Sequence, residues 1–269
     1  MKEARYSGRT VVVTGASQGI GKALSVALAP QRPRLVLVAR DEERLHEVAR
    51  ECRSAGALTL VVRADVGKPA DCERIVAECV HHFGGLDVLV HNAGISMWSR
   101  FDEVLDLSIY ETLMRVNYLS CVYLTHHALP HLKSARGQIV AVASLAGLTG
   151  VPTRSGYAAS KHAVFGFFDS LRIELREAGV SVTVVAPDFV VSEIHRRSVG
   201  PDGKALGQSP MQEKHLMTAE ECAARIIAAM ESRRRLAVLS LRGVVGRYVR
   251  LVAPGLIDRI ALRAVRRGR

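Results

Sequence analysis

The sequence predicts an α/β fold in which helices cover both faces of a parallel β-sheet. Short apolar runs rich in Val, Ile and Leu alternate with segments of helical periodicity along most of the chain. Continuous apolar strands are typical of a sheet that is buried on both faces. A glycine-rich turn also joins the first apolar run to the first helical segment. Because crossovers between parallel strands are right-handed, these observations together predict a doubly wound sheet.

Each element follows from its local pattern. Apolar, often β-branched runs predict strands at residues 10–13, 34–39, 58–63, 86–91, 137–144, 180–186 and 236–241. Helical spacing of apolar residues predicts helices at residues 20–29, 42–55, 70–83, 109–132 and 157–178. No linker rich in Gly, Pro or Ser divides the chain, so we expect a single domain.

The composition fits a globular enzyme, with 48% hydrophobic and 23% charged residues in a chain of 269. The five cysteines are odd in number and show no C-x-x-C spacing, so they predict neither a disulfide framework nor a thiolate metal site. The polar segment before the first strand has no secretory character, and no apolar run reaches the roughly 18 residues of a membrane span. We therefore expect a cytoplasmic protein.

The formal charge of +11 is concentrated at the C-terminus. Residues 233–269 contain eleven arginines, no lysine and a single acid, Asp258, and they carry +10 of this charge. We therefore expect a nearly neutral catalytic domain over residues 1–241 and a basic extension over residues 242–269.

The basic extension contains two segments, residues 244–252 and 256–265, whose apolar side chains fall on one helical face. Such helices either pack that face on the body or on a neighbouring subunit, or lie on an anionic membrane surface. The first arrangement is favoured, and peripheral membrane contact is the alternative. Nucleic-acid binding is not expected, because no stacking aromatics or recognised module accompany the charge.

Residues 14–21, T-G-A-S-Q-G-I-G, form the glycine-rich turn. Glycine lets a pyrophosphate approach the backbone, and the N-terminus of the next helix offers free N–H groups and a positive dipole end. The position between strand and helix favours dinucleotide binding over an ordinary tight turn. The residues expected to contact the cofactor here are Gly15, Ser17, Gln18, Gly19, Ile20 and Gly21.

The end of the second strand indicates which dinucleotide is bound. An acidic residue there would bind the ribose 2′-hydroxyl and repel a 2′-phosphate, but the sequence has Ala39 followed by Arg40. A guanidinium matches phosphate oxygens, so NADP(H) is favoured and NAD(H) is the alternative. Without a cofactor role, Arg40 would be an exposed side chain at a strand end. Asp65 and Val66 follow the third strand and are expected beside the adenine.

Three further motifs follow in order along the chain. Asn92-Ala93-Gly94 comes after the fourth strand, twelve residues separate Ser144 from Tyr157, and three more separate Tyr157 from Lys161. With the turn, this order strongly resembles the short-chain dehydrogenase/reductase family over roughly residues 8–192. The segment S-L-A-G-L-T-G-V-P-T-R-S-G-Y-A-A-S-K resembles its hydroxysteroid-dehydrogenase-like branch. The resemblance implies a Rossmann-type fold and a homodimer or homotetramer.

The resemblance also implies a role for each matching residue. Tyr157 would be the general acid/base, and Lys161 would bind the nicotinamide ribose and lower the tyrosine pKa. Ser144 would hydrogen-bond the substrate oxygen, and Asn117 would anchor a water of the proton relay. The residues that would line the cofactor beyond the turn are Asn92, Ala93, Gly94, Tyr157, Lys161, Pro187 and Ser192.

The residue types themselves support this chemistry. Tyr157 and Lys161 are four residues apart on a predicted helix and therefore share one face. A phenol has a pKa near 10, and an ammonium group at close range lowers it toward the working pH of a general acid/base. Each residue taken singly could be an ordinary helix or strand-end side chain. Their joint occurrence behind a nucleotide-binding turn favours the catalytic interpretation.

Four positions depart from the family pattern. Asp188 follows Pro187 where glycine is usual, and Gln18 occupies a position that is often basic in NADP-dependent members. Ser192 stands where threonine is common, and His91 where a second asparagine is frequent. None of these changes removes a catalytic group, although Gln18 weakens the argument for NADP(H).

We therefore predict an NADP(H)-dependent oxidoreductase that interconverts a ketone or aldehyde and an alcohol. The apolar segment 145–151 and the long loop after the sixth strand favour a hydrophobic, lipid- or steroid-like substrate, or an acyl substrate. No metal is expected, because His127 and His131 have ligand spacing without a carboxylate to complete a site. The alternatives are a non-catalytic NADP-binding regulator and a membrane-recruited interaction protein with the same fold.

Overall fold

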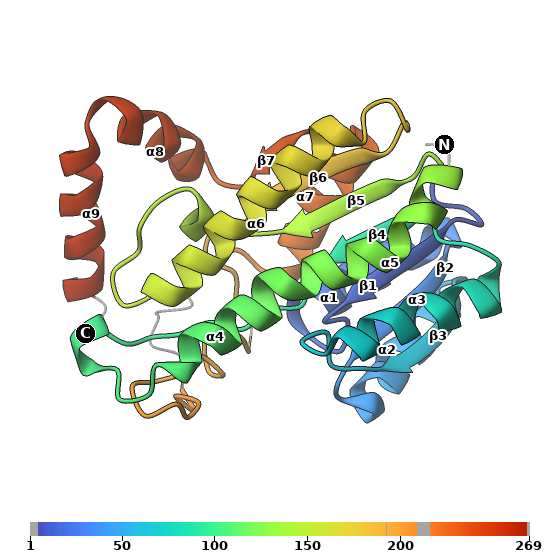
Figure 1. Ribbon diagram of the computed structural model, residues 1–269, viewed down its shortest axis with the longest axis horizontal. Coiled ribbons are helices and arrows are strands. Elements are labelled where there is room, and N and C mark those ends of the chain that lie inside the picture. Colours follow the sequence, from blue (N-terminus) through green and yellow to red (C-terminus); the bar gives the residue numbers. More distant parts are fainter. Residues whose placement is uncertain (1–4, 192, 209–215, 268–269) are drawn as a thin grey trace.

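A single parallel sheet organises the computed structural model, which describes residues 5–191, 193–208 and 216–267. Its seven strands lie in the order β3-β2-β1-β4-β5-β6-β7, and every pairing is parallel (Figure 1). The strands are β1 (Thr10–Thr14), β2 (Arg34–Ala39), β3 (Leu58–Arg63), β4 (Val88–His91), β5 (Gln138–Val142), β6 (Ser181–Ala186) and β7 (Leu236–Val238). The chain winds outward from β1 to β3 and then from β4 to β7 on the other side, which confirms the predicted doubly wound α/β fold.

Helices cover both faces of this sheet. One layer consists of α1 (Gly19–Leu28), α2 (Glu42–Ser54) and α7 (Ala219–Glu231). The other consists of α3 (Pro69–Phe83), α5 (Ser120–Ser134) and α6 (Ser155–Glu174). Because successive side chains of a strand point to opposite faces, Val11 and Val13 pack in the α1 layer while Val12 packs in the α3 layer.

The cysteines belong to this core and not to a disulfide framework. All five are free and buried. Burial raises the pKa of the Cys72 thiol to about 12 and that of Cys121 to about 11. They are therefore protonated at neutral pH and behave as small apolar side chains.

The helix predicted over residues 109–132 is longer and has an irregular centre. It comprises α4 (Ser108–Met114), a π-helical turn (Arg115–Leu119) and α5. A π turn inserts a residue into the helix and re-aims the side chains around it, and such turns are frequent at functional sites. Asn117 lies at the middle of this turn.

Helix α7 was not predicted. Its start is marked in the sequence, because the Thr218 hydroxyl accepts a hydrogen bond from the Glu221 backbone while the Glu221 carboxylate accepts one from the Thr218 backbone. This reciprocal capping box is a readable helix signal. The helix packs beside α1 and completes one covering layer of the sheet.

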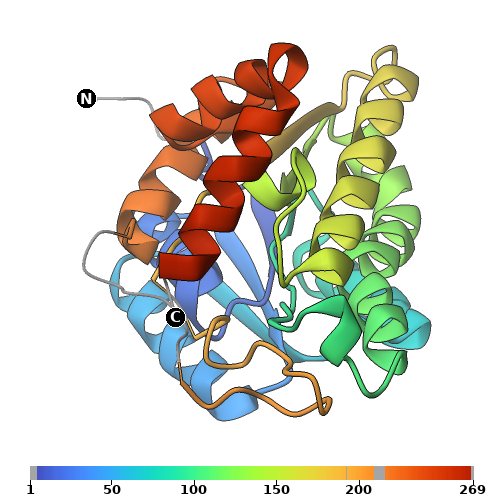
Figure 2. The same cartoon turned by 90° about the vertical axis from the view of Figure 1, so that its left-hand side faces the viewer.

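The basic extension folds into two helices at the carboxyl ends of the strands. They are α8 (Leu241–Val252) and α9 (Pro254–Arg267), and in Figure 2 α9 crosses in front of the sheet. Pro254 begins α9, a position where its missing N–H costs nothing. The two helices stand over the same edge of the sheet that holds the glycine-rich turn (Figures 1 and 2).

Candidate active site

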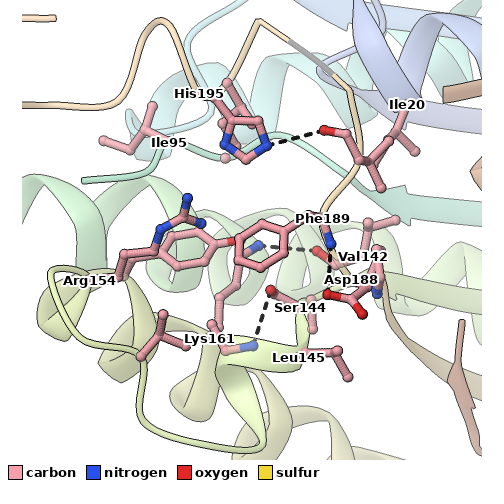
Figure 3. A pocket seen from close by; sticks show the side chains of 18 of the residues that line it. Ile20, Ile95, Val142, Ser144, Leu145, Arg154, Lys161, Asp188, Phe189 and His195 are labelled. Carbon is pink, nitrogen blue, oxygen red and sulfur yellow. Dashed lines mark hydrogen bonds between the residues drawn. The ribbon is translucent and has the colours of Figure 1, made fainter. Parts of the chain in front are cut away.

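A large cavity opens at the carboxyl ends of the strands, where open α/β sheets bind their ligands. Its volume is about 1260 Å³, and it extends from the glycine-rich turn to the C-terminal helices. Figure 3 shows part of its lining, with Ser144, Arg154 and Lys161 among the labelled side chains. Among the described residues predicted for the site, only Gly21 and Asn117 lie outside the lining.

The glycine-rich turn has the geometry that a dinucleotide requires. Gly15 and Gly19 adopt φ angles of +67° and +53°, which favour glycine. A Cβ at Gly21 would lie 2.2 Å from the carbonyl oxygen of Gly15, so this glycine lets α1 pack against the turn. The backbone is therefore left open where a pyrophosphate would lie, at the N-terminus of a helix.

The sequence did not single out Thr14, which fastens the turn to the neighbouring strand end. Its hydroxyl accepts hydrogen bonds from the backbone N–H groups of Asn92 and Ala93 at 3.0 and 3.1 Å. The Asn92 side chain in turn donates to the Thr14 carbonyl at 2.9 Å. The N-A-G motif is thus held against the turn across β1 and β4, and both border the cavity.

Arg40 and Asp65 lie in the cavity lining at the ends of β2 and β3, where the sequence predicts the adenosine. Arg44 from α2 donates a hydrogen bond to the Gln18 side chain at 2.9 Å. Gln18 occupies the position that is often basic in NADP-dependent members of the family, and here Arg44 of α2 brings a basic side chain to it. Asp41 caps α2 by accepting from the Arg44 backbone at 3.2 Å, and it pairs with the Arg44 guanidinium at 3.4 Å.

Ser144, Tyr157 and Lys161 come together at the other end of the cavity. Tyr157 and Lys161 occupy neighbouring turns of α6, and the Lys161 ammonium lies 5.8 Å from the centre of the tyrosine ring. That ammonium donates to the Val142 carbonyl at 3.1 Å, which holds it against the end of β5. The Ser144 hydroxyl oxygen accepts from the Ala146 backbone at 3.1 Å, so its own proton can be donated elsewhere.

Asn117 lies behind this group and is buried. Its carboxamide both accepts from the Ile95 N–H at 2.8 Å and donates to the Ile95 carbonyl at 2.9 Å. A further hydrogen bond runs to the Ser160 hydroxyl at 2.9 Å. A Cβ at Gly94 would lie 3.1 Å from the Asn117 side chain and 3.6 Å from the Lys161 ammonium. Asn117 therefore positions the loop after β4 beside Lys161.

The segment after β6 holds an interaction that no local sequence pattern predicts. Pro187 lines the cavity as expected, and Ser192 lies outside the described residues. Asp188 accepts a hydrogen bond from Arg242 of α8 at 2.6 Å and one from Ser240 at 2.7 Å. Burial raises the pKa of the Asp188 carboxyl, but the bonds from Arg242 and Ser240 lower it more, and the net pKa is below its usual value.

The C-terminal helices form the far wall of the cavity. Helix α9 contributes Leu256, Ile257, Ile260 and Ala261, and α8 contributes Val245, Gly246 and Val249. These four α9 residues belong to the predicted apolar face, and Leu256 and Ile260 remain 50% and 52% exposed while they line the cavity. The predicted stripe on α8 divides, because Tyr248 and Val252 are 59% and 84% exposed while Val249 lines the cavity.

His91, which precedes the N-A-G motif where a second asparagine is frequent, is buried beside Phe168 with 5.3 Å between ring centres. Burial lowers the pKa of its imidazole to about 3, so the ring is neutral at physiological pH. Its Nε2 is hydrogen-bonded to the Thr125 hydroxyl at 2.9 Å. The histidine therefore has a structural role in the core under the site.

The arrangement fits a dinucleotide, because the turn at Gly15 and Gly19 lines the cavity at the N-terminus of α1, where backbone N–H groups can receive a pyrophosphate. Within the described part of the chain, no helix is both long and apolar enough to span a bilayer. Over the same part, no group of three His, Cys, Asp or Glu side chains has the geometry of a metal site.

Comparisons with known proteins agree with this arrangement. The profile of a family described as short chain dehydrogenase matches residues 9–201. The chain is 42% identical over 224 residues to 11-beta-hydroxysteroid dehydrogenase-like 4A of Arabidopsis thaliana, covering 83% of this chain and 73% of the plant protein. It is 36% identical to an 11-beta-hydroxysteroid dehydrogenase of Pinus massoniana, with 93% and 72% covered.

A third relative is the Dehydrogenase/reductase SDR family protein 7-like of Dictyostelium discoideum, at 34% identity with 95% of this chain and 81% of that protein covered. These matches favour an enzyme over the two non-catalytic alternatives. The chain therefore belongs to the short-chain dehydrogenase family, in its hydroxysteroid-dehydrogenase-like branch, and is an oxidoreductase that acts on CH–OH and C=O groups with NAD(P).

Proposed function

We propose that this enzyme is an NADP(H)-dependent oxidoreductase of hydrophobic ketones and alcohols, with Tyr157 as its general acid/base. One observation carries the proposal. Ser144, Tyr157 and Lys161 line the same cavity as the glycine-rich turn, and α8 and α9 line it mainly with apolar side chains.

The residues divide the chemistry between them. The nicotinamide supplies or accepts the hydride when bound. In reduction, the Tyr157 hydroxyl donates its proton to the carbonyl oxygen as the carbonyl carbon gains the hydride, and in oxidation it takes a proton from the alcohol. The Ser144 hydroxyl donates a hydrogen bond to the same oxygen, since its acceptor side is occupied by the Ala146 N–H. Lys161, held by Val142, is the residue expected at the nicotinamide ribose.

Positive charge at the end of β2 supports NADP(H) over NAD(H). Arg40 lines the cavity where an acidic residue would select a 2′-hydroxyl, and Arg44 lies within hydrogen-bond distance of Gln18. The Asp41 carboxylate is already paired with Arg44, so its charge is partly neutralised. A 2′-phosphate there would meet the Arg40 guanidinium, with Arg44 close by on α2.

The relatives that are called 11-beta-hydroxysteroid dehydrogenases support a hydrophobic substrate, as does the apolar lining from α9. A lipid- or steroid-like alcohol or ketone is the class we assign. An acyl substrate, whose hydrocarbon chain would need the same apolar wall, is the alternative.

We also propose peripheral contact between the outer face of α8 and an anionic membrane. Leu251 and Val252 are 77% and 84% exposed there, next to the arginines Arg247 and Arg250. Replacing both apolar residues by glutamate should reduce co-sedimentation with vesicles rich in phosphatidylserine, whereas unchanged sedimentation would contradict membrane contact. If the double variant instead loses a dimer that the wild type forms, this face would be assigned to contact with a second copy of the chain. Analytical ultracentrifugation of both proteins measures this and also tests the predicted homodimer or homotetramer.

The proposed function is tested by a screen of carbonyl and alcohol substrates, including ketosteroids, fatty ketones and acyl thioesters. Each is measured with NADPH or NADP and again with NADH or NAD. We expect turnover of hydrophobic members with the phosphorylated cofactor preferred. A wide preference for NAD(H) would contradict the cofactor assignment, and turnover of small polar carbonyls alone would contradict the substrate class.

A further inference from the structure

A second, smaller cavity lies at the amino ends of the strands, whereas the active-site cavity lies at their carboxyl ends. Its volume is about 270 Å³, and it opens where β1, β4 and β5 begin, beside the ends of α5 and α7. These three strands are four or five residues long, so the two cavities are about 15 Å apart. This amino-end pocket has no role in the proposed function.

The amino-end pocket is bordered by more positive than negative charge. Two carboxylates border it, and one of them, Asp87, accepts from the Arg9 guanidinium at 2.6 Å and from the Thr10 N–H at 2.8 Å. The other, Glu231, accepts a hydrogen bond from the Gln31 side chain at 3.4 Å. Four arginines border the same pocket, so positive charges exceed negative ones by two. These arginines are Arg5, Arg9, Arg136 and Arg233.

The backbone places Arg136 and Arg233 in the same way. Arg136 lies just beyond α5 and Arg233 just beyond α7, and both adopt left-handed φ angles, +46° and +45°. At each end, the N–H groups of the arginine and of the next residue donate to carbonyls of the last helical turn, which is the Schellman arrangement. Glycine is the usual residue at this position, as Gly84 is after α3. Two helices therefore end on an arginine where glycine would be favoured, and both arginines border one pocket.

These two guanidinium groups are the ones left for a ligand. Among the described residues, none forms a hydrogen bond or an ion pair with the Arg136 or the Arg233 guanidinium. Arg5, by contrast, donates to the Glu231 carbonyl. The stem of Arg136 is packed, because a Cβ at Gly179 would lie 3.3 Å from its Cγ. An arginine after a helix also interacts favourably with the negative end of the helix dipole, so a purely structural role is the alternative to be tested.

Two buried polar side chains line the amino-end pocket between these arginines and the core. Tyr6 and Gln138 are 5% and 4% exposed, and the Tyr6 hydroxyl donates to the Gln138 carbonyl oxygen at 3.4 Å. The Gln138 amide nitrogen donates to the Met230 carbonyl at 3.1 Å, which ties the start of β5 to the end of α7. Burial raises the pKa of the Tyr6 phenol to about 12, so it is neutral at physiological pH and adds no negative charge.

We propose that the amino-end pocket binds a small organic anion with two negative charges, a dicarboxylate or a phosphate monoester, through Arg136 and Arg233. A guanidinium forms two parallel hydrogen bonds to a carboxylate or a phosphate, so both ligands present the same chemistry. A volume of about 270 Å³ lies below the range of pockets for drug-sized ligands and fits a molecule of a few carbon atoms. The bound anion connects the ends of α5 and α7 and stabilises the fold by mass action.

The test measures binding of two dianions to the enzyme saturated with NADPH, so that the cofactor already fills the anion site of the glycine-rich turn. Succinate and glycerol 3-phosphate are titrated by calorimetry in about 50 mM salt, with uncharged glycerol as the ligand control. At least one dianion should bind with a stoichiometry of one and a Kd below about 1 mM, and it should raise the melting temperature. The dianion that binds more tightly tells dicarboxylate from phosphate. No saturable binding of either up to about 10 mM would overturn the proposal.

Substitution then locates the binding. Arg136→Gln and Arg233→Gln should each raise the Kd about tenfold, because each removes a charge-assisted contact. Arg32→Gln is the matched control, since Arg32 is also exposed and left-handed, with φ of +55°, but lies outside the pocket. Its Kd should stay within about twofold of the wild type, which separates a site from the general attraction of anions to a chain of charge +11. An unchanged Kd in the Arg136→Gln, Arg233→Gln double variant would overturn the assignment.

A glycine substitution separates the anion site from a structural role of the two arginines. Glycine is the favoured residue at a left-handed helix end, so Arg136→Gly should leave the melting temperature without ligand unchanged or slightly higher. The same variant should lose most of the rise in melting temperature that the dianion gives the wild type. A variant that melts at a lower temperature, yet keeps the full rise with the dianion, would overturn the proposal and assign Arg136 to the stability of α5.

Discussion

The two ends of the cavity are built in different ways. The end at the glycine-rich turn, where we propose the cofactor, consists of strand ends and tight turns that are hydrogen-bonded to one another, as Thr14 is to Asn92 and Ala93. The end where we propose the substrate is bordered by α8 and α9, and the contact between Asp188 and Arg242 helps hold α8 in place across a separation of 54 residues. The shape of the end at the glycine-rich turn therefore depends on the sheet itself. The shape of the end at α8 and α9 depends on side-chain contacts between segments that are distant in the sequence.

This difference predicts how each end of the cavity should respond to substitution. Backbone geometry tolerates no added atom, so the cofactor end should fail sharply when a glycine gains a Cβ. A wall held by side chains can shift as a unit, so the substrate end should respond with graded changes in KM. Four pairs of variants test this contrast, from the largest expected effect to the smallest.

Gly21→Ala should have the largest effect. The new Cβ would lie 2.2 Å from the Gly15 carbonyl oxygen, so either α1 or the turn must move. We expect the affinity for NADPH to fall by about tenfold or more, since overpacking of this kind costs about 1–3 kcal/mol. Fluorescence titration with NADPH measures it.

The control for this variant is Gly166→Ala, at an exposed position of α6 where a Cβ meets nothing within 4 Å. That change should leave NADPH affinity unchanged and slightly stabilise the helix. Equal affinities in the two variants would remove the assigned role of the turn.

Arg40→Leu should have the next largest effect. Loss of a charge-assisted contact to a 2′-phosphate should raise the KM for NADPH by about tenfold while the KM for NADH stays within about twofold. Arg50→Gln on α2, which also removes an exposed arginine but does not line the cavity, should change neither. Parallel losses with both cofactors in Arg40→Leu would rule out selection of the 2′-phosphate at this position.

Arg242→Gln should have a moderate effect at the other end. Without its partner, Asp188 keeps a charge in a site where only 9% of its side chain is exposed, and α8 loses an anchor. We expect the KM for a hydrophobic substrate to rise about threefold to tenfold with little change in NADPH affinity. Arg247→Gln, on the same helix with its guanidinium over Tyr248, should be neutral.

The same contact predicts a pH dependence with a definite sign. The pKa of Asp188 is depressed in the folded protein, so its contribution is present above the unfolded pKa near 4 and is lost as the pH falls through the folded value. The KM effect of Arg242→Gln should therefore be constant from pH 6 to 9. A contribution that disappears between pH 6 and 8 would show that another group is responsible.

Gly243→Ala should have the smallest effect. Its Cβ would lie 2.7 Å from the Leu145 side chain and 2.9 Å from that of Val238, both of which can move aside. We expect a rise of about twofold in the KM for hydrophobic substrates, as α8 shifts outward. Gly246→Ala on the same helix meets nothing within 4 Å and should raise the melting temperature slightly instead. A larger effect at Gly246 than at Gly243 would contradict the packing of α8 described here.

The same contrast explains what could be predicted from sequence. The apolar strand runs, the glycine-rich turn and the spacing of Ser144, Tyr157 and Lys161 are local patterns that can be read from the sequence. The structure places the turn and these three residues on one cavity at the carboxyl ends of the strands. The hydrogen bond between Arg242 and Asp188 is not local. Asp188 departs from the family pattern and Arg242 lies in the C-terminal extension, and the two residues meet only because α8 folds back onto the segment after β6. The burial of Arg154 could not be predicted either, because it comes from contacts with Trp98 and Phe189, which two separate loops bring beside it.

Tyr157 links the two ends, and its replacement by phenylalanine tests the central assignment most directly. With any substrate that the wild type turns over, kcat should fall by about a hundredfold to ten-thousandfold, since the proton donor is gone. NADPH affinity should stay within about threefold, because the turn and Lys161 are intact. Tyr118→Phe, which alters a tyrosine in edge-to-face contact with Phe167, should retain full activity. Turnover by Tyr157→Phe within a few-fold of the wild type would contradict the assignment of Tyr157 as the general acid/base.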